Sequence, residues 1–338
     1  MKSILIPAVI LCSVIFSKPP SPVLLAPGQT IIDESFSKTI DTNRWHVSKG
    51  AWKIEKGALR GEELAADHHA GSIKLPFVYT NAIIQFSFRL EKDSGFSISL
   101  NDPDGHNSRL TINNESMLVK KDADKKDPAS FSAVLAECQA AFEPGKWYDM
   151  TIEVSGKAFI AKSAGKEFAA GFHNGIDTMK SDLALPVTGV VYFDNIKILA
   201  GIPLPGTEKT LSGLNDEQKK RPPVKYKNVQ TGYSVRESIM RYKLMQEDPV
   251  FGELVKKRIS AVNALEQAFP QAFKKGKKAE EEKKRLQQEN AEYKALNAET
   301  GKIRREELNY LMERDADLKE YWTKLQEERK KNSPTEKK

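Results

Sequence analysis

Residues 31–199 are built of short runs in which apolar and polar residues alternate. The clearest run, 84–90, reads Ile-Gln-Phe-Ser-Phe-Arg-Leu, so its apolar side chains share one face. Alternation of period two predicts a strand with one buried and one solvated face. Further runs lie at 51–54, 72–75, 96–100, 109–113, 116–120, 147–154, 157–161 and 189–199, with Gly, Asn, Asp and Pro between many of them. This many strands predicts two packed antiparallel sheets.

Turn signals connect three consecutive runs of this region. Asp93-Ser94-Gly95 separates 84–90 from 96–100, and the segment 101–105 separates 96–100 from 109–113. We therefore predict that the three runs form consecutive hairpins of one sheet. Their outward side chains would then share one face, formed by Gln85, Ser87, Arg89, Ser97, Ser99, Arg109 and Thr111. Hydroxyl, amide and guanidinium groups suit polyol recognition, although any antiparallel sheet has a solvated face.

The N-terminus has the pattern of a secretory signal. Lys2 precedes an apolar run at 4–16 and a proline-rich segment at 17–22. Such a run is too short to span a bilayer comfortably, so we predict a signal peptide over 1–17 and export to the periplasm, cell surface or exterior. The bulky Ile15 marks the cleavage site poorly, which leaves a signal anchor open. With Cys12 in the signal, only Cys138 remains, and no internal disulfide is possible.

Composition divides the rest of the chain. We predict a spacer over 18–30, the sandwich over 31–200, a proline-rich and lysine-rich linker over 201–232, a helical region over 233–331 and a disordered tail over 332–338. Heptad spacing in the last helical segment is broken, and Thr300-Gly301 marks a possible bend. A helical hairpin, a loosely paired coiled coil and a solitary charged helix remain open, and a coiled coil would support homo-oligomers.

Positive charge is concentrated in the C-terminal part. From Gly206 onward about 31 Lys and Arg face about 23 Asp and Glu, with basic clusters at 274–278 and 283–285. Nucleic acid is the usual first partner of such clusters, but export argues against it. An anionic envelope polymer or acidic polysaccharide fits better, and a solvated helix face is the simplest interpretation.

Several short motifs of the sandwich region follow one another in a distinctive order. They are Trp45, the segment 50–59, Ser94-Gly95-Phe96, Gly145-Lys146-Trp147-Tyr148 and the segment 191–196. This order resembles the concanavalin A-like jelly rolls of the 3-keto-disaccharide hydrolase and glycoside hydrolase family 16-like type. The resemblance covers roughly Ile31 to Leu199 and implies an all-β jelly-roll sandwich, a concave polar face and a saccharide ligand.

The sequence departs from that family in its carboxylates. Retaining hydrolases of this fold carry paired carboxylates on one strand, and this chain has no Glu-x-Asp-x-x-Glu run. Cleavage of ordinary β-glucans by that machinery is therefore disfavoured. Three tryptophans, Trp45, Trp52 and Trp147, could supply an aromatic platform, although core packing is the alternative for each.

Two loop segments combine carboxylate and imidazole groups: Asp67-His68-His69 and the segment 101–106. If the loops converge, His68 or His106 would act as acid or base, and Asp67 and Asp102 would orient them or bind a metal. The substrate contacts would then be Gln85, Arg89, Ser97, Ser99, Asn101, Arg109 and His69. The alternative is that both segments are solvated turns. The pattern specifies no cofactor and no complete set of metal ligands.

These observations favour an exported carbohydrate-related protein that binds a saccharide, and they leave open its hydrolysis by the loop His and Asp groups. Two alternatives remain open. One is a non-catalytic, lectin-like protein assembled through its helical tail, and the other is a structural envelope protein.

Overall fold

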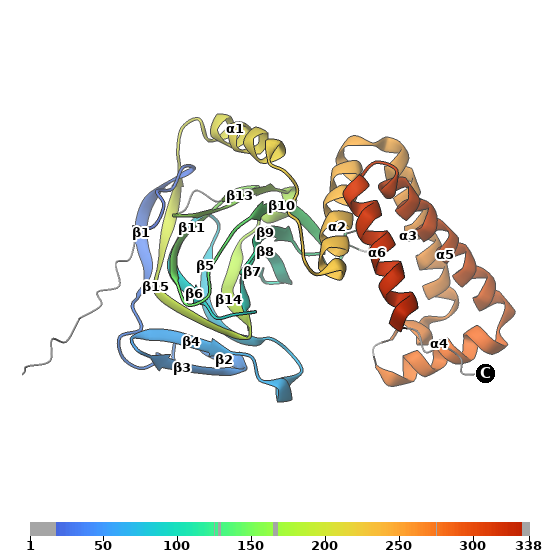
Figure 1. The fold of residues 1–338 in the computed structure, drawn as a ribbon, viewed down its shortest axis with the longest axis horizontal. Helices are drawn as coiled ribbons and strands as arrows, with labels where there is room; N and C mark the ends of the chain where they lie inside the picture. The colour runs from blue at the N-terminus through green and yellow to red at the C-terminus, as the bar shows by residue number, and fades with distance from the viewer. Residues whose placement is uncertain (1–17, 125, 128–129, 165–167, 275, 333–338) are drawn as a thin grey trace, which may run out of the picture.

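The computed structural model describes residues 18–124, 126–127, 130–164, 168–274 and 276–332, and the predicted signal peptide lies outside them. Its first half is a sandwich of fifteen strands (Figure 1). They are β1 (Leu25–Glu34), β2 (His46–Lys49), β3 (Ala51–Glu55), β4 (Ala58–Glu62), β5 (Gly71–Tyr79), β6 (Ala82–Leu90), β7 (Gly95–Asp102), β8 (Gly105–Asn113), β9 (Ser116–Lys121), β10 (Ala133–Gln139), β11 (Trp147–Ser155), β12 (Ala158–Ser163), β13 (Phe168–Phe172), β14 (Lys180–Thr188) and β15 (Val190–Pro203). Every strand predicted from alternation is present. The sequence prediction missed β1, β2, β4, β10, β13 and β14.

The strands form two antiparallel sheets, which confirms the predicted all-β sandwich. The eight-stranded sheet has the order β13-β12-β11-β6-β15-β4-β3, with β1 added beside β15, and the seven-stranded sheet has the order β10-β9-β8-β7-β14-β5-β2. β7 and β8 pair as predicted. The predicted hairpin of 84–90 with 96–100 is wrong, because β6 and β7 belong to opposite sheets.

The core of the sandwich lies between the two sheets. Aromatic side chains from both sheets meet there, with the Phe96 ring 5.0 Å from Phe88 and 5.0 Å from Phe193, measured between centroids. Trp45 and Cys138 are also buried in this cluster. Cys138 is therefore a packed core residue.

The segment before β1 is fixed to the eight-stranded sheet. The buried carboxylate of Glu153 accepts hydrogen bonds from the backbone N–H groups of Val23, Leu24 and Leu25 at 2.7 to 3.0 Å. Charged acceptors make the stronger hydrogen bonds of proteins, so this contact holds the start of the chain firmly. The predicted spacer is thus partly strand.

Six α-helices follow the sandwich: α1 (Thr207–Lys220), α2 (Val229–Glu247), α3 (Pro249–Ala268), α4 (Lys277–Glu289), α5 (Ala291–Met312) and α6 (Ala316–Asn332). α1 lies inside the predicted linker, whose prolines fall outside the helix. Asp248 ends α2 and caps α3 by accepting hydrogen bonds from Val250 N and Phe251 N. Within the described residues, no helix is long and apolar enough to cross a membrane.

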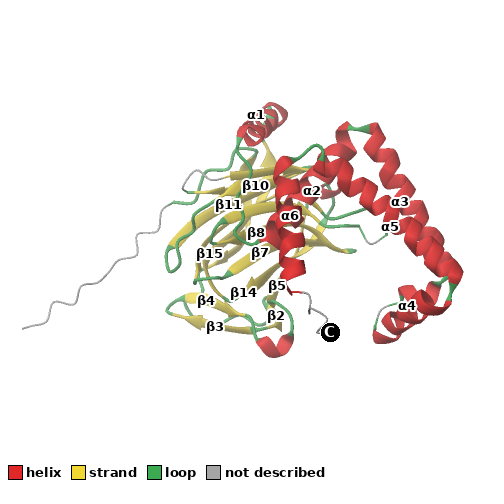
Figure 2. Cartoon of the chain, turned by 45° about the vertical axis from the view of Figure 1, so that its right-hand side comes forward, coloured by secondary structure: helices red, strands yellow, loops and turns green. Residues whose placement is uncertain are grey.

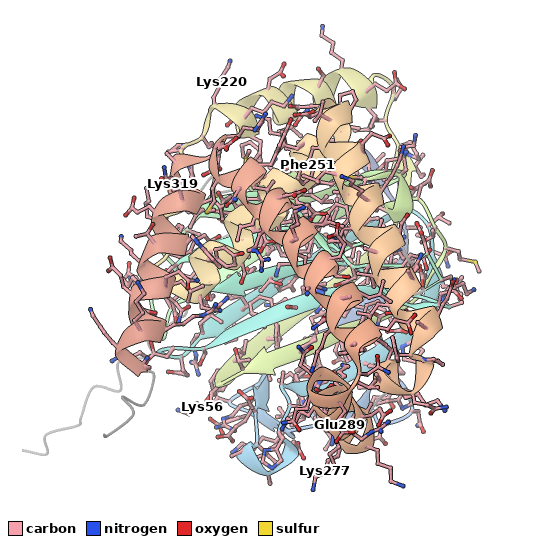
Figure 3. The ribbon with its side chains drawn as sticks, turned by 90° about the vertical axis from the view of Figure 1, so that its right-hand side faces the viewer. Lys56, Lys220, Phe251, Lys277, Glu289 and Lys319 are labelled. Atoms are coloured by element: carbon pink, nitrogen blue, oxygen red, sulfur yellow. The ribbon has the colours of Figure 1, made fainter. Side chains whose placement is uncertain are left out.

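α2, α3, α5 and α6 pack into a bundle beside the sandwich (Figure 2). Phe251 is fully buried in this bundle with Leu311 and Leu318, and Figure 3 shows it among the helices. The carboxylate of Glu307, also buried, binds Arg241 and Arg258 at 2.5 and 2.8 Å. The structure confirms a helical region but not a coiled coil: the helices are short and antiparallel pairs are joined by brief loops. The predicted bend at Thr300-Gly301 is wrong, because both residues lie within α5.

The helical region docks on the outer face of the seven-stranded sheet (Figure 1). Leu118 and Val134 of the sandwich pack there against Val224, Val235 and Tyr321. Buried Glu137 of β10 holds the contact together, as an acceptor for Val224 N, the Tyr226 hydroxyl and Arg236. The bundle therefore partly covers the outer face of the seven-stranded sheet. The outer face of the eight-stranded sheet lies away from the bundle, but the segment before β1 and Leu211 and Leu214 of α1 pack on the part of it near β12 and β13.

Candidate functional site

The two histidine segments lie in exposed connections of the sandwich. Asp67 accepts a hydrogen bond from Gly50 N at 2.6 Å, and His68 follows it in the left-handed region at φ 48°. His69 is exposed, with its Nδ1 2.8 Å from the Ala70 carbonyl oxygen. Asp67 thus fixes its own loop, which is the role expected of a turn aspartate.

The second segment forms the turn between β7 and β8. Asp102 accepts hydrogen bonds from Asp104 N at 3.0 Å and from the Asn107 side chain at 2.9 Å. The Asn101 side chain contacts His106 Nδ1 at 2.8 Å and donates to Asp182 at 2.5 Å. These contacts build a well-bonded turn.

The two segments do not converge, which corrects the prediction of a shared site. Gly71, just after His69, pairs with Val187 of β14, whereas Asn101 pairs with Asp182 of the same strand. Five residues of extended strand separate these pairs by about 16 Å. His68 and His69 therefore lie at the opposite end of the sheet from His106, and they cannot act on one bond together. A role for either cluster alone stays a prediction.

The predicted polar face is divided between the two sheets. Gln85 and Arg89 lie on β6 of the eight-stranded sheet, while the remaining predicted contacts on strands, Ser97, Ser99, Asn101 and Arg109, lie on the seven-stranded sheet. The prediction that they share one face is wrong, because the chain crosses the sandwich between β6 and β7.

Side chains of the seven-stranded face are already bonded to one another. Arg109 binds both carboxylate oxygens of Asp122, at 2.8 and 2.7 Å. The hydroxyls of Ser97 and Thr111 are 3.0 Å apart, and Ser99 is buried, although its hydroxyl has no hydrogen-bond partner among the described residues. The bidentate pair uses two of the five N–H donors of Arg109 and fixes the position of the guanidinium. This face offers few groups to a ligand.

On the outer face of the eight-stranded sheet, five neighbouring strands place their side chains in one row. Cross-strand pairing gives the order Trp147, Arg89, Tyr192, Arg60 and Lys53, from β11 to β3. We call this the aromatic row. The Arg89 guanidinium lies 3.8 Å from the Tyr192 ring centroid and 5.5 Å from that of Trp147. Cation–π contact with two rings holds Arg89 in place.

A second row, the acidic row, lies one outward position farther along three of these strands. Pairing aligns Asp149 of β11, Ser87 of β6 and Asp194 of β15. The Ser87 hydroxyl donates to Asp149 at 2.6 Å, and Asn195 lies at a bulge with φ 51° and reaches the same hydroxyl at 3.4 Å. Two carboxylates therefore flank one hydroxyl beside the aromatic row.

The surroundings of these rows change their acidity. Burial raises the pKa of Asp194 above its usual value, and the hydrogen bond from Asn195 N only partly opposes this. Hydrogen bonds from Lys53 and then Tyr192 lower the pKa of Glu55, which lies beside the aromatic row. The site thus combines a carboxylate that releases its proton more readily than usual with one that holds its proton more tightly.

Sequence reasoning identified part of this site. Gln85 and Arg89 were predicted contacts, and of the three tryptophans only Trp147 belongs to the aromatic row; Trp45 is buried and Trp52 packs against the core. Tyr192 and Asp194 occur in the family-like motif at 191–196, but they were not predicted as site residues. Asp149 follows Trp147 by two positions, a spacing that puts both side chains on one face.

No metal centre accompanies these rows. Among the residues that the structure describes, no group of three or more His, Cys, Asp and Glu side chains is arranged to hold a metal ion.

No family model matches the chain, and no curated protein matches it either. Solved structures similar to the sandwich half include carbohydrate-binding module CBM66 from Bacillus subtilis, with 11% identity, 46% of this chain and 95% of that chain covered, and a TM-score of 0.39. A protein of unknown function with a galectin-like fold from Bacillus subtilis has 8% identity, covers 54% and 100% of the two chains and has a TM-score of 0.43. Crh5 transglycosylase in complex with NAG has 11% identity and a TM-score of 0.40, and the match covers 54% of this chain and 89% of that chain. At such values the likeness carries no inference about activity.

Proposed function

We propose that this protein is an exported saccharide-binding protein whose binding surface is the outer face of the eight-stranded sheet. One observation carries the proposal: the aromatic row and the acidic row lie side by side on this face. Aromatic rings pack against the apolar faces of sugar rings, while carboxylates and guanidinium groups bind hydroxyls. Arg89, with Trp147 on one side and Tyr192 on the other, would occupy the centre of the site.

The position of this face supports the proposal. The helical region docks on the other sheet, so the aromatic row faces away from it (Figure 1). Arg89 and Arg60 are partly exposed, with 23% and 16% of their side chains accessible. A ligand can therefore reach charged groups that the packed rings hold in position, which lowers the entropy cost of binding.

Titration of the full chain with a panel of neutral oligosaccharides, including 3-keto disaccharides, tests this function by calorimetry. We expect Trp147→Ala and Arg89→Ala each to weaken binding about tenfold or more, as removal of central interface anchors does. Arg44→Ala, which removes an exposed arginine elsewhere on the sandwich, is the matched control and should bind as the wild type does. Unchanged affinity in both site variants would contradict the proposal.

Hydrolysis of the bound saccharide is the second candidate function. It is favoured by the acidic row, in which Asp149 and Asp194 lie two strand spacings apart, about 10 Å between their Cα atoms. Inverting glycosidases separate their two carboxyl groups by roughly 6.5 to 9.5 Å, and their acid has a raised pKa. Asp194 would then be the acid and Asp149 the base.

One experiment distinguishes the two candidate functions, saccharide binding alone and saccharide hydrolysis. Asp194→Asn and Asp149→Asn should keep saccharide binding within a few-fold but abolish product release if the rows hydrolyse the ligand. Binding with no product from the wild type would leave a lectin-like protein and exclude the hydrolase.

A further inference from the structure

The far end of the helical region contains a cavity of about 580 Å³ between α3, α4 and α5. Its apolar floor includes Val262, Leu265 and Phe273, and Tyr293 closes one side. Tyr293 and Leu265 are each only 4% exposed, so this floor belongs to a packed cluster and keeps its shape. Figure 3 labels Lys277 and Glu289 of α4, and Figure 2 shows α4 away from the sandwich.

The charged groups of this cavity are all positive. Lys283, Arg304 and Arg305 line it, and no aspartate or glutamate is among the lining residues. Arg304 and Arg305 are exposed, and within the described chain neither has a carboxylate within ion-pair distance. Lys283 binds Glu280 at 2.9 Å, but that carboxylate is 66% exposed and lies outside the cavity. By contrast, three arginines of the bundle, Arg236, Arg241 and Arg258, are largely buried against carboxylates.

The cavity continues into a second hollow along α4. The two share Lys283, Tyr293 and Asn297, and the second is also lined by Glu280, Lys284, Gln287 and Gln288. Asn297 donates to the Gln287 side chain at 2.9 Å, which fixes both amides at the junction. The one carboxylate, Glu280, is paired with Lys283. An extended anion would thus meet an excess of cations, with amides between them, whereas a single small ion would use only one hollow.

We propose that this cationic groove, formed by Lys283, Lys284, Arg304 and Arg305, binds an anionic polysaccharide through its carboxylate or sulfate groups. Arginine forks pair with such planar or multidentate anions, and amides bind the hydroxyls between them. Single-stranded nucleic acid fits less well, because its binding sites present aromatic faces for base stacking. Here the buried Tyr293 ring packs edge-on against Phe269, with centroids 5.2 Å apart and planes at 85°.

The test uses the full chain and fluorescently labelled oligogalacturonate, with binding followed by anisotropy at low and high salt. We expect binding that weakens with salt, and a loss of at least tenfold in the double variant Arg304→Gln/Arg305→Gln. Lys302→Gln removes a neighbouring exposed charge of α5 outside the groove and should change affinity less than twofold. Ala298→Glu, which adds a carboxylate to the lining, should weaken binding as strongly as the double variant does.

Three outcomes would overturn the proposal. The double variant and Lys302→Gln could weaken binding equally, which would mean that only general positive charge matters. A single-stranded DNA oligonucleotide of equal charge could bind more tightly than both oligogalacturonate and a sulfated oligosaccharide. The wild type could also fail to bind either anionic oligosaccharide. Thermal unfolding of each variant checks that the bundle remains folded, and Arg44→Ala, which removes an exposed arginine of the sandwich outside both sites, should bind oligogalacturonate normally.

Discussion

The two outer faces of the sandwich hold their arginines in different ways, although the exposure of these arginines is similar. On the seven-stranded sheet, Arg109 is 25% exposed and makes a bidentate pair with Asp122, while the buried Glu137 binds the helical region. On the eight-stranded sheet, Arg89 is 23% exposed, lies between two aromatic rings and makes one looser contact with Glu91 at 3.5 Å. A polar sheet face is therefore not by itself evidence of a binding site. What distinguishes a candidate site is polar groups that packing holds in place but whose hydrogen-bonding capacity is still available.

The largest effect expected from this comparison concerns Glu137. Glu137→Ala removes the acceptor of Val224 N, the Tyr226 hydroxyl and Arg236, and it leaves these groups buried. Breaking a buried ion pair by removing one partner costs about 3 to 5 kcal/mol. We expect a loss of that size in the free energy of unfolding by urea, together with earlier proteolysis between the sandwich and the bundle.

Glu115→Ala is the matched control for that variant. Glu115 also connects the sandwich to the helical region, through Lys227, but the lysine side chain is 87% exposed. Exposed pairs contribute about 0 to 1 kcal/mol, so the control should unfold almost as the wild type does. Equal losses in the two variants would show that burial of Glu137 does not determine docking.

The second effect concerns Lys180, at the start of β14. Its ammonium is fully buried and donates to Ile176 O, Thr178 O and the Thr178 hydroxyl. Burial lowers the pKa of Lys180 to about 8 despite the nearby Asp102 and Asp177. Between pH 8 and the pKa of an ordinary lysine, the unfolded chain therefore binds the proton that the folded chain releases. Stability should rise with pH across this window, by roughly 3 kcal/mol.

Unfolding of the wild type and of Lys180→Met at a series of pH values measures this contribution by difference. The variant should lack the rise, while Lys74→Met, which removes an exposed lysine of the neighbouring β5, should retain it. If stability rose equally with pH in the wild type and in Lys180→Met, groups other than Lys180 would cause the rise.

Nine of the fifteen strands, and the helical region, could be predicted from the sequence because they show local periodicity. The runs at 84–90 and 147–154, for example, each place alternate apolar side chains on the core face of a strand, and alternation is enough to identify them. Strand pairing could not be predicted in this way. Asp93-Ser94-Gly95 has the composition of a hairpin turn, but the Ser94 hydroxyl accepts from Val190 N, and the chain crosses to the other sheet there.

The candidate site was only partly predictable for the same reason. The aromatic row joins Trp147, Arg89 and Tyr192, which lie far apart in the sequence and become neighbours only through the strand order β11-β6-β15. Alternation shows that each side chain points outward, but it does not specify which sheet the strand enters. Gln85 and Arg89 thus remain predicted contacts, with a different set of neighbours from the predicted one.

A third prediction compares one arginine on each face. Arg109→Ala breaks the bidentate pair with Asp122, whose side chains are 25% and 16% exposed, and should cost about 1 kcal/mol of stability without changing saccharide affinity. Arg89→Ala should do the reverse, with a loss of affinity and a smaller loss of stability. Calorimetric titration and urea unfolding of both variants measure the two quantities. If Arg109→Ala weakened saccharide binding more than Arg89→Ala, the assignment of the two faces would have to be exchanged.

The smallest effect is expected at the histidines. His68 and His106 are exposed and lie at opposite ends of the seven-stranded sheet, about 16 Å or more apart by strand register. Exposed substitutions away from special features change stability by about 0.5 kcal/mol or less. His68→Ala, His106→Ala and the double variant should therefore keep wild-type saccharide affinity and nearly wild-type stability. A loss of product release in one single variant, with binding intact, would instead place chemistry on the seven-stranded sheet. That result would overturn the comparison from which these predictions start.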